Sequence, residues 1–256
     1  MKNGNVRARG IDRVVDVLEF FRTTRQPAAI GDIARKLNAP RSTLYEIVSR
    51  LTEAGILESI DNQGRVFFGS AVYFYADAYL ASQPLLRSGR DEVIRLAETT
   101  GETTQLCMLF GNKYTVAHMQ PGSRLFRISS ETGILVPIPW TASGRVLLGN
   151  MSEEQVMNFI PADDFQLPTG KIIPISDFMQ DIQTAHDQGY AITSALTDEL
   201  TCCVAAPILH QTSGQPVATV CFVLPVNTDD DRKKELIELL KASSRTISVR
   251  LGTGQF

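Results

Sequence analysis

The chain has 256 residues, of which 43% are hydrophobic and 21% charged, and its formal net charge at pH 7 is −3. This length allows two domains that each bury a core of their own. No apolar run reaches the roughly 18–20 residues of a membrane-spanning helix, and the N-terminus has no signal-peptide core. Four cysteines without paired spacing favour a reducing compartment. We therefore expect a cytoplasmic protein without a membrane partner.

The charge divides unevenly along the chain. Residues 1–69 carry 11 Lys+Arg against 8 Asp+Glu, a net charge of +3, whereas residues 70–256 carry 14 against 20, a net charge of −6. Only the first part therefore favours a polyanion as partner.

Three amphipathic helices are predicted near the N-terminus. The first, over 11–21, is expected to bury Val14, Val15, Leu18 and Phe21. The second, over 30–37, carries an i, i+3, i+4, i+7 stripe of Ile30, Ile33, Ala34 and Leu37. The third begins at Pro40 with Asn38 as its cap, and its buried face is expected to be Leu44, Ile47, Val48 and Leu51. The last two helices, separated by a tight break, are typical of a helix-turn-helix.

The outward face of the third helix is polar and suits a DNA groove, because Arg, Ser and Thr reach phosphates and base edges. An ordinary helical hairpin with a polar outer face is the alternative. Gly55 then stands where a helix-ending glycine belongs, and two short strands around the turn 61–64 predict a wing. At its base, Arg65 either contacts phosphate or is merely solvated. The expected DNA-contacting residues are Arg41, Ser42, Thr43, Tyr45, Glu46, Arg50 and Arg65.

Residues 70–84 read as an aromatic-rich linker helix. Its four aromatic side chains exceed what one small face hides within a monomer, so a partner subunit is inferred; they are Tyr73, Phe74, Tyr75 and Tyr79.

From residue 85 onward, helices and strands alternate. Helices are expected over 85–101, 141–148, 152–159, 176–188 and 228–251, the third of these with a capping box of Ser152 and Gln155 and the last opened by Thr228 and Asp231. Strand pairs are expected over 103–110 with 113–120, and over 202–210 with 216–224. Short links within the pairs favour an antiparallel sheet. The fold class is therefore α+β: a winged helix-turn-helix (1–69), a linker helix (70–84) and a mixed α/β effector-binding domain with an antiparallel sheet (85–256).

The whole chain resembles an IclR-type transcriptional regulator. The matching segments are IGDIARKL, APRSTLYEIVSRL and GIL with the wing, followed by GETTQL, TASGRVLL, HDQGYAI and CVAAPI. The resemblance implies a homodimer or homotetramer that binds double-stranded operator DNA and responds to a small catabolic metabolite. It predicts a repressor of a catabolic operon, in which effector binding changes subunit geometry and operator affinity.

One departure from the family lies in the recognition helix, where Glu46 stands in place of a usual Arg. A carboxylate can accept a hydrogen bond from cytosine N4 in the major groove, so the operator sequence would differ. Alternatively, Glu46 pairs with Arg50 at i+4 and never meets DNA.

The resemblance also implies an effector pocket formed by Ala142, Ser143, Thr193, Cys203 and Cys221. Thr193 and Cys221 stand where the family has an acidic residue and a serine, which leaves weak donors and acceptors suited to a compact, little-charged metabolite. We expect a small carboxylate, hydroxy acid, lactone or semialdehyde, as a regulator of γ-butyrolactone catabolism would sense. Buried Cys is also commonly just a small hydrophobe.

An enzyme is not predicted, because the chain has no phosphate-cradling glycine loop after a strand and no GxSxG elbow. With neither CxxC nor HxxxH present, no metal site is expected, and no cofactor is implied. Two alternatives stay open: a metabolite-transforming enzyme on the α/β domain, and a constitutive DNA-binding or scaffold protein.

Overall fold

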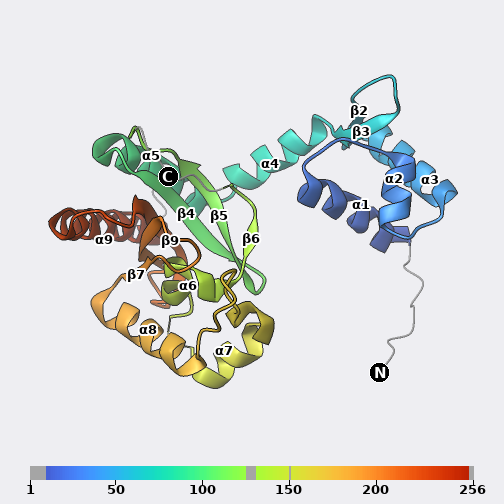
Figure 1. Ribbon diagram of the computed structural model, residues 1–256. Helices are drawn as coiled ribbons and strands as arrows, with labels where there is room; N and C mark the ends of the chain where they lie inside the picture. Colours follow the sequence, from blue (N-terminus) through green and yellow to red (C-terminus); the bar gives the residue numbers. More distant parts are fainter. Residues whose placement is uncertain (1–9, 125–130, 150, 254–256) are drawn as a thin grey trace. The chain divides into compact units, whose positions relative to one another are not determined.

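A computed structural model describes residues 10–124, 131–149 and 151–253. The described residues fall into two compact units that divide between Ser82 and Gln83 (Figure 1). In the first unit the elements are α1 (Gly10–Thr24), β1 (Ala28–Ala29), α2 (Ile30–Lys36), α3 (Arg41–Glu53), β2 (Leu57–Ser59), β3 (Arg65–Phe68) and α4 (Ala71–Ala81). The strands pair antiparallel in the order β1-β3-β2, so the predicted helices and wing are confirmed.

The core of the first unit is built around Phe21, which is fully buried. Its ring makes edge-on contacts with Phe20, Phe67 and Phe68, and these contacts join α1 to the wing strand β3. The predicted burial of Val15 is wrong: it is 57% exposed, and Val17 is buried instead. The buried stripe of α1 runs through Val17 and Phe21, four residues apart, and Val15 lies on the opposite side.

The turn between α2 and α3 differs from the prediction. Asn38 does not cap α3; it adopts a left-handed conformation with φ 48°, and Pro40 occupies the N-cap position without a side-chain hydrogen bond. Asn tolerates this region better than most residues, so it serves the turn rather than the helix end. Gly55, with φ 70°, follows the C-cap of α3 as predicted.

Helix α4 is exposed along its length. None of its residues is buried, and its four aromatic side chains are between 53% and 69% exposed; they are Tyr73, Phe74, Tyr75 and Tyr79. The helix stops at Ala81, because Pro84 begins the separate helix α5 (Pro84–Thr100).

The second unit is built on one antiparallel sheet. Its strands are β4 (Thr103–Phe110), β5 (Lys113–Gln120), β6 (Leu135–Val136), β7 (Ala191–Ser194), β8 (Thr201–Leu209) and β9 (Pro216–Pro225). In the described part of the chain they form a six-stranded sheet ordered β6-β5-β4-β9-β8-β7. All pairs are antiparallel, which confirms the predicted sheet type. The short strands β1, β6 and β7 were not predicted, since two to four residues carry too little alternation.

Helices cover both faces of this sheet, giving two cores. On one face α5 and α9 (Asp230–Thr253) pack on alternate strand residues such as Leu106, Val204 and Phe222. The other face carries the short elements η1 (Ile138–Trp140) and η2 (Ala162–Phe165) with α6 (Ala142–Leu147), α7 (Glu153–Phe159) and α8 (Ile175–Gln188). No helix of the described residues is long and apolar enough to cross a membrane.

Of the N-terminal caps predicted for α7 and α9, the first is confirmed and the second is wrong. The capping box of Ser152 and Gln155 opens α7 as predicted. At α9 the predicted pair of Thr228 and Asp231 is wrong. Asp229 accepts the backbone N–H groups of Asp231 and Arg232, while the Thr228 hydroxyl donates to the Pro225 carbonyl.

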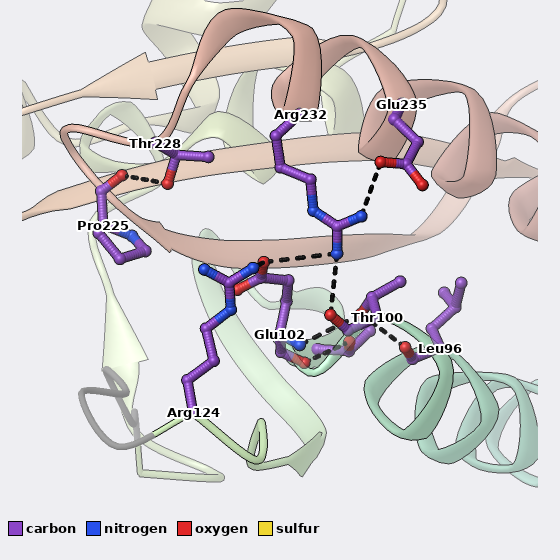
Figure 2. Close-up of polar contacts among 9 residues, drawn as sticks. Leu96, Thr100, Glu102, Arg124, Pro225, Thr228, Arg232 and Glu235 are labelled. Atoms are coloured by element: carbon purple, nitrogen blue, oxygen red, sulfur yellow. Dashed lines mark hydrogen bonds and ion pairs between the residues drawn. The ribbon is translucent and has the colours of Figure 1, made fainter.

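A buried carboxylate links β4 to α9 (Figure 2). The Glu102 side chain is 3% exposed, and its Oε1 lies 2.6 Å from Arg124 Nη2 and 3.7 Å from Arg232 Nη2. Neither contact has hydrogen-bond geometry, so both are ion pairs. Arg232 Nη2 donates instead to the Thr100 carbonyl at 2.8 Å. Burial raises the pKa of Glu102, and the two guanidinium groups only partly offset it.

This raised pKa predicts a specific pH dependence of stability. Between the ordinary Glu value and the raised one, the native state holds a proton that the unfolded state releases, so acidification through this window stabilises the fold. The free energy of unfolding of the wild type, relative to Glu102→Gln, should therefore be larger at about pH 5 than at about pH 7. Urea titrations of both proteins at the two pH values measure this difference. A larger difference at neutral pH would mean that the ion pairs outweigh burial.

Candidate functional site

The exposed face of α3 is the candidate nucleic-acid interface. Leu44, Ile47, Val48 and Leu51 are buried as predicted, which turns the polar residues outward. Arg41, Ser42, Tyr45, Glu46, Ser49 and Arg50 are exposed, and Thr43 is half-buried. Arg41 begins the helix and has no polar partner among the described residues. Its guanidinium is therefore available to an anion beside the helix N-terminus.

Farther along this face, the structure differs from one of the two predictions for Glu46, namely that it pairs with Arg50. Arg50 pairs with Glu53 at 3.0 Å and not with Glu46. Within the described chain Glu46 has no polar partner, and its carboxylate is exposed. The structure thus leaves Glu46 available for an external hydrogen-bond donor.

The wing holds Arg65 at its base. Asp61 Oδ1 accepts the backbone N–H groups of Gln63 and Arg65, and its Oδ2 accepts from Arg65 Nε at 2.5 Å. Hydrogen bonding to Arg65 lowers the pKa of Asp61, which is half-buried. The Arg65 side chain is half exposed, so it can reach a phosphate only by sharing its guanidinium with Asp61.

A cavity of about 380 Å³ lies in the second unit, between the sheet and the start of α6. Its size is that of a small-ligand pocket. The described lining residues come from β4, β5, β8 and β9, from the segments 131–143 and 197–198, and from Pro168. Apolar side chains form much of the wall, and the polar groups include Gln105, Tyr114, Thr141, Ser143 and Asp198.

The start of α6 forms one wall of the cavity. Thr141 caps the helix by accepting the backbone N–H of Gly144 at 2.8 Å. A Cβ at Gly144 would lie 2.1 Å from the Ile138 carbonyl oxygen, so glycine is required for η1 and α6 to meet this closely. Ser143 lines the cavity and accepts a hydrogen bond from Thr219 Oγ1 at 2.8 Å, which leaves its own proton to donate.

Two thiols lie on the side of the cavity that the sheet forms. Cys203 on β8 and Cys221 on β9 both line the cavity, and the Cys221 thiol donates to the Phe222 carbonyl at 3.4 Å. The interaction between the two thiols lowers the pKa of Cys203 and, together with burial, raises the pKa of Cys221. Cys202, one residue away, belongs to the opposite core, because side chains alternate along a strand.

Most of the predicted effector residues come together in this cavity. Ala142, Ser143, Cys203 and Cys221 are lining residues. Thr193 is not; it lies on β7, where its backbone pairs with Cys203. Trp140 is half-buried and also lines the cavity, with its indole Nε1 donating to the Asp164 carbonyl at 2.9 Å.

Several lining residues were not predicted. Gln105 lies directly opposite Cys221 in the β4–β9 ladder, so strand alternation was a usable signal for it. Asp198 and Thr201 join through a 2.6 Å hydrogen bond from Thr201 Oγ1, which helps to lower the pKa of Asp198. No sequence pattern indicated this loop. Within the described residues, no group of three His, Cys, Asp or Glu side chains is arranged to hold a metal ion.

Two family models match the chain. The one described as "IclR helix-turn-helix domain" matches residues 10–61, and "Bacterial transcriptional regulator IclR C-terminal" matches residues 77–249. Among curated relatives, the HTH-type transcriptional repressor AllR of Escherichia coli (strain K12) is 23% identical over 248 residues, covering 96% of this chain and 91% of the relative. The repressor of the same name from Salmonella typhi is 21% identical, with 96% and 90% covered.

Solved structures share the fold. An IclR transcriptional regulator from Alicyclobacillus acidocaldarius aligns with a TM-score of 0.83 at 16% identity, covering 95% of this chain and 98% of the other. An IclR homologue from Microbacterium hydrocarbonoxydans, complexed with 4-hydroxybenzoate, aligns with a TM-score of 0.80 at 23% identity, covering 95% and 99%. The likeness therefore extends over both units.

Proposed function

The chain belongs to the IclR family of bacterial transcriptional regulators, and from this premise we propose that it represses a small-metabolite catabolic operon. The relatives named as repressors support this direction of control. The observation that carries the proposal is one chain holding both an exposed polar recognition helix and a cavity of about 380 Å³. The first suits operator DNA, and the second suits a small effector.

The DNA-binding part of the proposal rests on α3 and the wing. Arg41, Ser42 and Thr43 lie in the first turn of α3, where backbone N–H groups favour a phosphate. Tyr45, Glu46 and Arg50 follow on the same helix, and Arg65 lies in the wing. We assign operator contact to these residues and no catalytic role to any residue.

The effector part rests on the cavity. Its hydroxyl, amide and thiol groups and its apolar wall suit a compact ligand, and the small carboxylate, hydroxy acid, lactone or semialdehyde class fits its volume. The homologue bound to 4-hydroxybenzoate supports a ligand-responsive role. Ala142, Ser143, Cys203 and Cys221 are the proposed contacts, and Thr193 acts at most through Cys203.

We assign the exposed α4 to self-association. None of its residues is buried by the described part of the chain, and a second copy would bury its apolar side chains in a homodimer, from which a homotetramer can be built. In this scheme residues 70–84 link the DNA-binding domain 1–69 to the effector domain 85–256. Effector binding then alters subunit geometry, and two recognition helices no longer match half-sites about one helical turn apart.

The test uses the full-length protein and the DNA that flanks its own gene. Fluorescence anisotropy should show a specific complex without ligand, and one member of a panel of small carboxylates, hydroxy acids, lactones and semialdehydes should both raise the melting temperature and weaken the complex. Light scattering measures the oligomeric state. If the protein binds no DNA specifically, the regulator proposal fails; turnover of a panel member would instead support an enzyme.

Glu46 gives a finer prediction about operator choice. Replacing Glu46 by Ala should relax discrimination at one C·G base pair by about 1–3 kcal/mol, since its carboxylate can accept from cytosine N4. Competition binding with operators altered at single positions measures this. Glu58→Ala, which removes an exposed carboxylate on β2 outside the assigned contacts, is the matched control and should leave base preference unchanged. Unchanged discrimination in Glu46→Ala would show that this side chain does not read a base.

A further inference from the structure

A second, smaller cavity lies on the same side of the sheet as the proposed effector cavity. Its volume is about 150 Å³, and it lies between α6, the C-terminal half of α8, the end of β8 and the turn before β9. Much of its wall is apolar, with Val146, Ile182 and Ala185 among the lining residues. The described lining also holds two nitrogen groups that can donate hydrogen bonds, Arg145 and His186, and no carboxylate.

Arg145 has an incomplete set of hydrogen-bond partners, although its side chain is only 5% exposed. Its Nε donates to Asp181 Oδ2 at 2.8 Å. Its Nη1 donates to the carbonyl oxygens of Pro139 at 3.0 Å and Thr141 at 2.9 Å. Nη2 has no hydrogen-bond partner among the described residues. The N–H groups left to donate are therefore both on one nitrogen of a buried side chain that lines the cavity.

The positive charge of Arg145 is only partly balanced within the fold. Asp181, its ion-pair partner, is 51% exposed, so water screens this carboxylate. Burial lowers the pKa of Arg145, because the charged form loses its hydration. On a buried side chain, a donor without a protein partner usually binds a water, an ion or a ligand. An anionic oxygen is the strongest of these partners for a guanidinium group.

Arg145 also contacts the wall of the effector cavity. The two carbonyl groups that Nη1 binds belong to Pro139 and Thr141, the residues on either side of Trp140. Trp140 and Thr141 both line the effector cavity. One guanidinium group thus lines the second cavity and fixes the backbone of the first. An anion bound to Nη2 should consequently change the surroundings of Trp140.

We propose that the second cavity is a binding site for a short aliphatic carboxylate, with one carboxylate oxygen accepting from Arg145 Nη2. The hydrocarbon tail lies against the apolar wall formed by Val146, Ile182 and Ala185. An inorganic anion would leave this wall uncovered, which is why the ligand carries a tail. This site is separate from the effector cavity, and its occupancy does not depend on operator binding.

Sodium butyrate is the probe, and butyramide, which has a similar shape without the charge, is its matched control. In titrations of the full-length protein at constant ionic strength, butyrate should change the fluorescence of Trp140 with saturation and raise the melting temperature. Butyramide should bind about tenfold more weakly, since it cannot form the charged hydrogen bond. The absence of a saturable response, or equal affinity for the two compounds, would overturn the proposal.

Two substitutions locate the bound butyrate. Ala185→Val adds bulk to the wall of the second cavity and should weaken butyrate binding by about tenfold or more. Cys203→Met adds bulk to the effector cavity instead and should leave butyrate affinity unchanged. The reverse pattern would place butyrate in the effector cavity and would overturn the proposal.

Val146→Ala makes the opposite change and guards against an effect of misfolding, because a damaged protein does not gain a ligand. The enlarged cavity should prefer a longer carboxylate such as hexanoate over butyrate, whereas the wild type should prefer butyrate. An unchanged preference for chain length would show that the tail does not lie in this cavity. If the protein binds its operator but gives no saturable butyrate signal, only this inference fails. If butyrate binds as described but no operator is bound, the proposed function fails and the second site stands.

Discussion

Arg41→Ala should weaken operator binding by about ten- to a hundredfold, a loss of about 1–3 kcal/mol. The guanidinium lies at the start of α3, exposed and without a polar partner among the described residues, so its charge is wholly available to DNA. Its removal should hardly change the fold, because the buried face of α3 begins at Leu44. Anisotropy titrations at several salt concentrations measure the effect.

The salt series also identifies the contact. If Arg41 binds a phosphate, the proposed homodimer loses one contact per subunit, so the variant should lose about two units of the slope of log affinity against log salt, equally for all sequences. If it reads a guanine, the loss should be confined to the specific operator. Arg22→Ala, on α1 and paired with Glu19, is the control and should bind normally. Equal loss in both variants would indicate general electrostatics and would contradict the assigned role of α3.

Gly144→Ala should destabilise the second unit by about 1–3 kcal/mol or more, the range of overpacked cores. The added Cβ would lie 2.1 Å from the Ile138 carbonyl oxygen, an atom of the backbone that cannot swing aside. The corner between η1 and α6 must then open, and Ala142 and Ser143 move with it. Binding of any effector in the cavity should therefore be lost together with stability.

The single tryptophan offers a direct measurement. Trp140 ends η1, next to this corner, so its fluorescence during a urea titration reports unfolding at the site concerned. Ser213→Ala, in the exposed β8–β9 turn, is a control within the same unit and should change the midpoint little. If Gly144→Ala matches the wild type in both midpoint and effector response, the close contact has no structural importance.

Helical periodicity predicted the first unit well, because Leu44, Ile47, Val48 and Leu51 recur at helical spacing on one face. The same rule failed at Val15, since α1 carries apolar residues on more than one side. Periodicity alone does not show which of these sides is buried. Asn38 was misassigned for a related reason: the residue type suits both a helix cap and a left-handed turn, and only the tertiary arrangement selects the second.

The cavity was predictable only in part. Ser143 and Cys203 were predicted to line it from the segments that resemble the IclR family. Gln105 could have been predicted from its position opposite Cys221 in the strand register. Asp198 lies in a loop without periodicity, so its approach to the cavity depends on how β7 and β8 are joined. Thr193 was predicted from segment similarity; it lies opposite Cys203 on the same face of the sheet, and it stays outside the described lining of the cavity.

The sheet of the second unit is a single wall between two cores. Along β9, Cys221 and Val223 line the cavity, whereas Val220 and Phe222 belong to the core with α5 and α9. A saturation screen across this strand should consequently show a phenotype with a period of two. Odd positions would yield folded regulators that ignore or mistake their inducer, and even positions would yield proteins that fail to accumulate. The mutant phenotypes alone would then show which residues of β9 face the cavity and which face the opposite core.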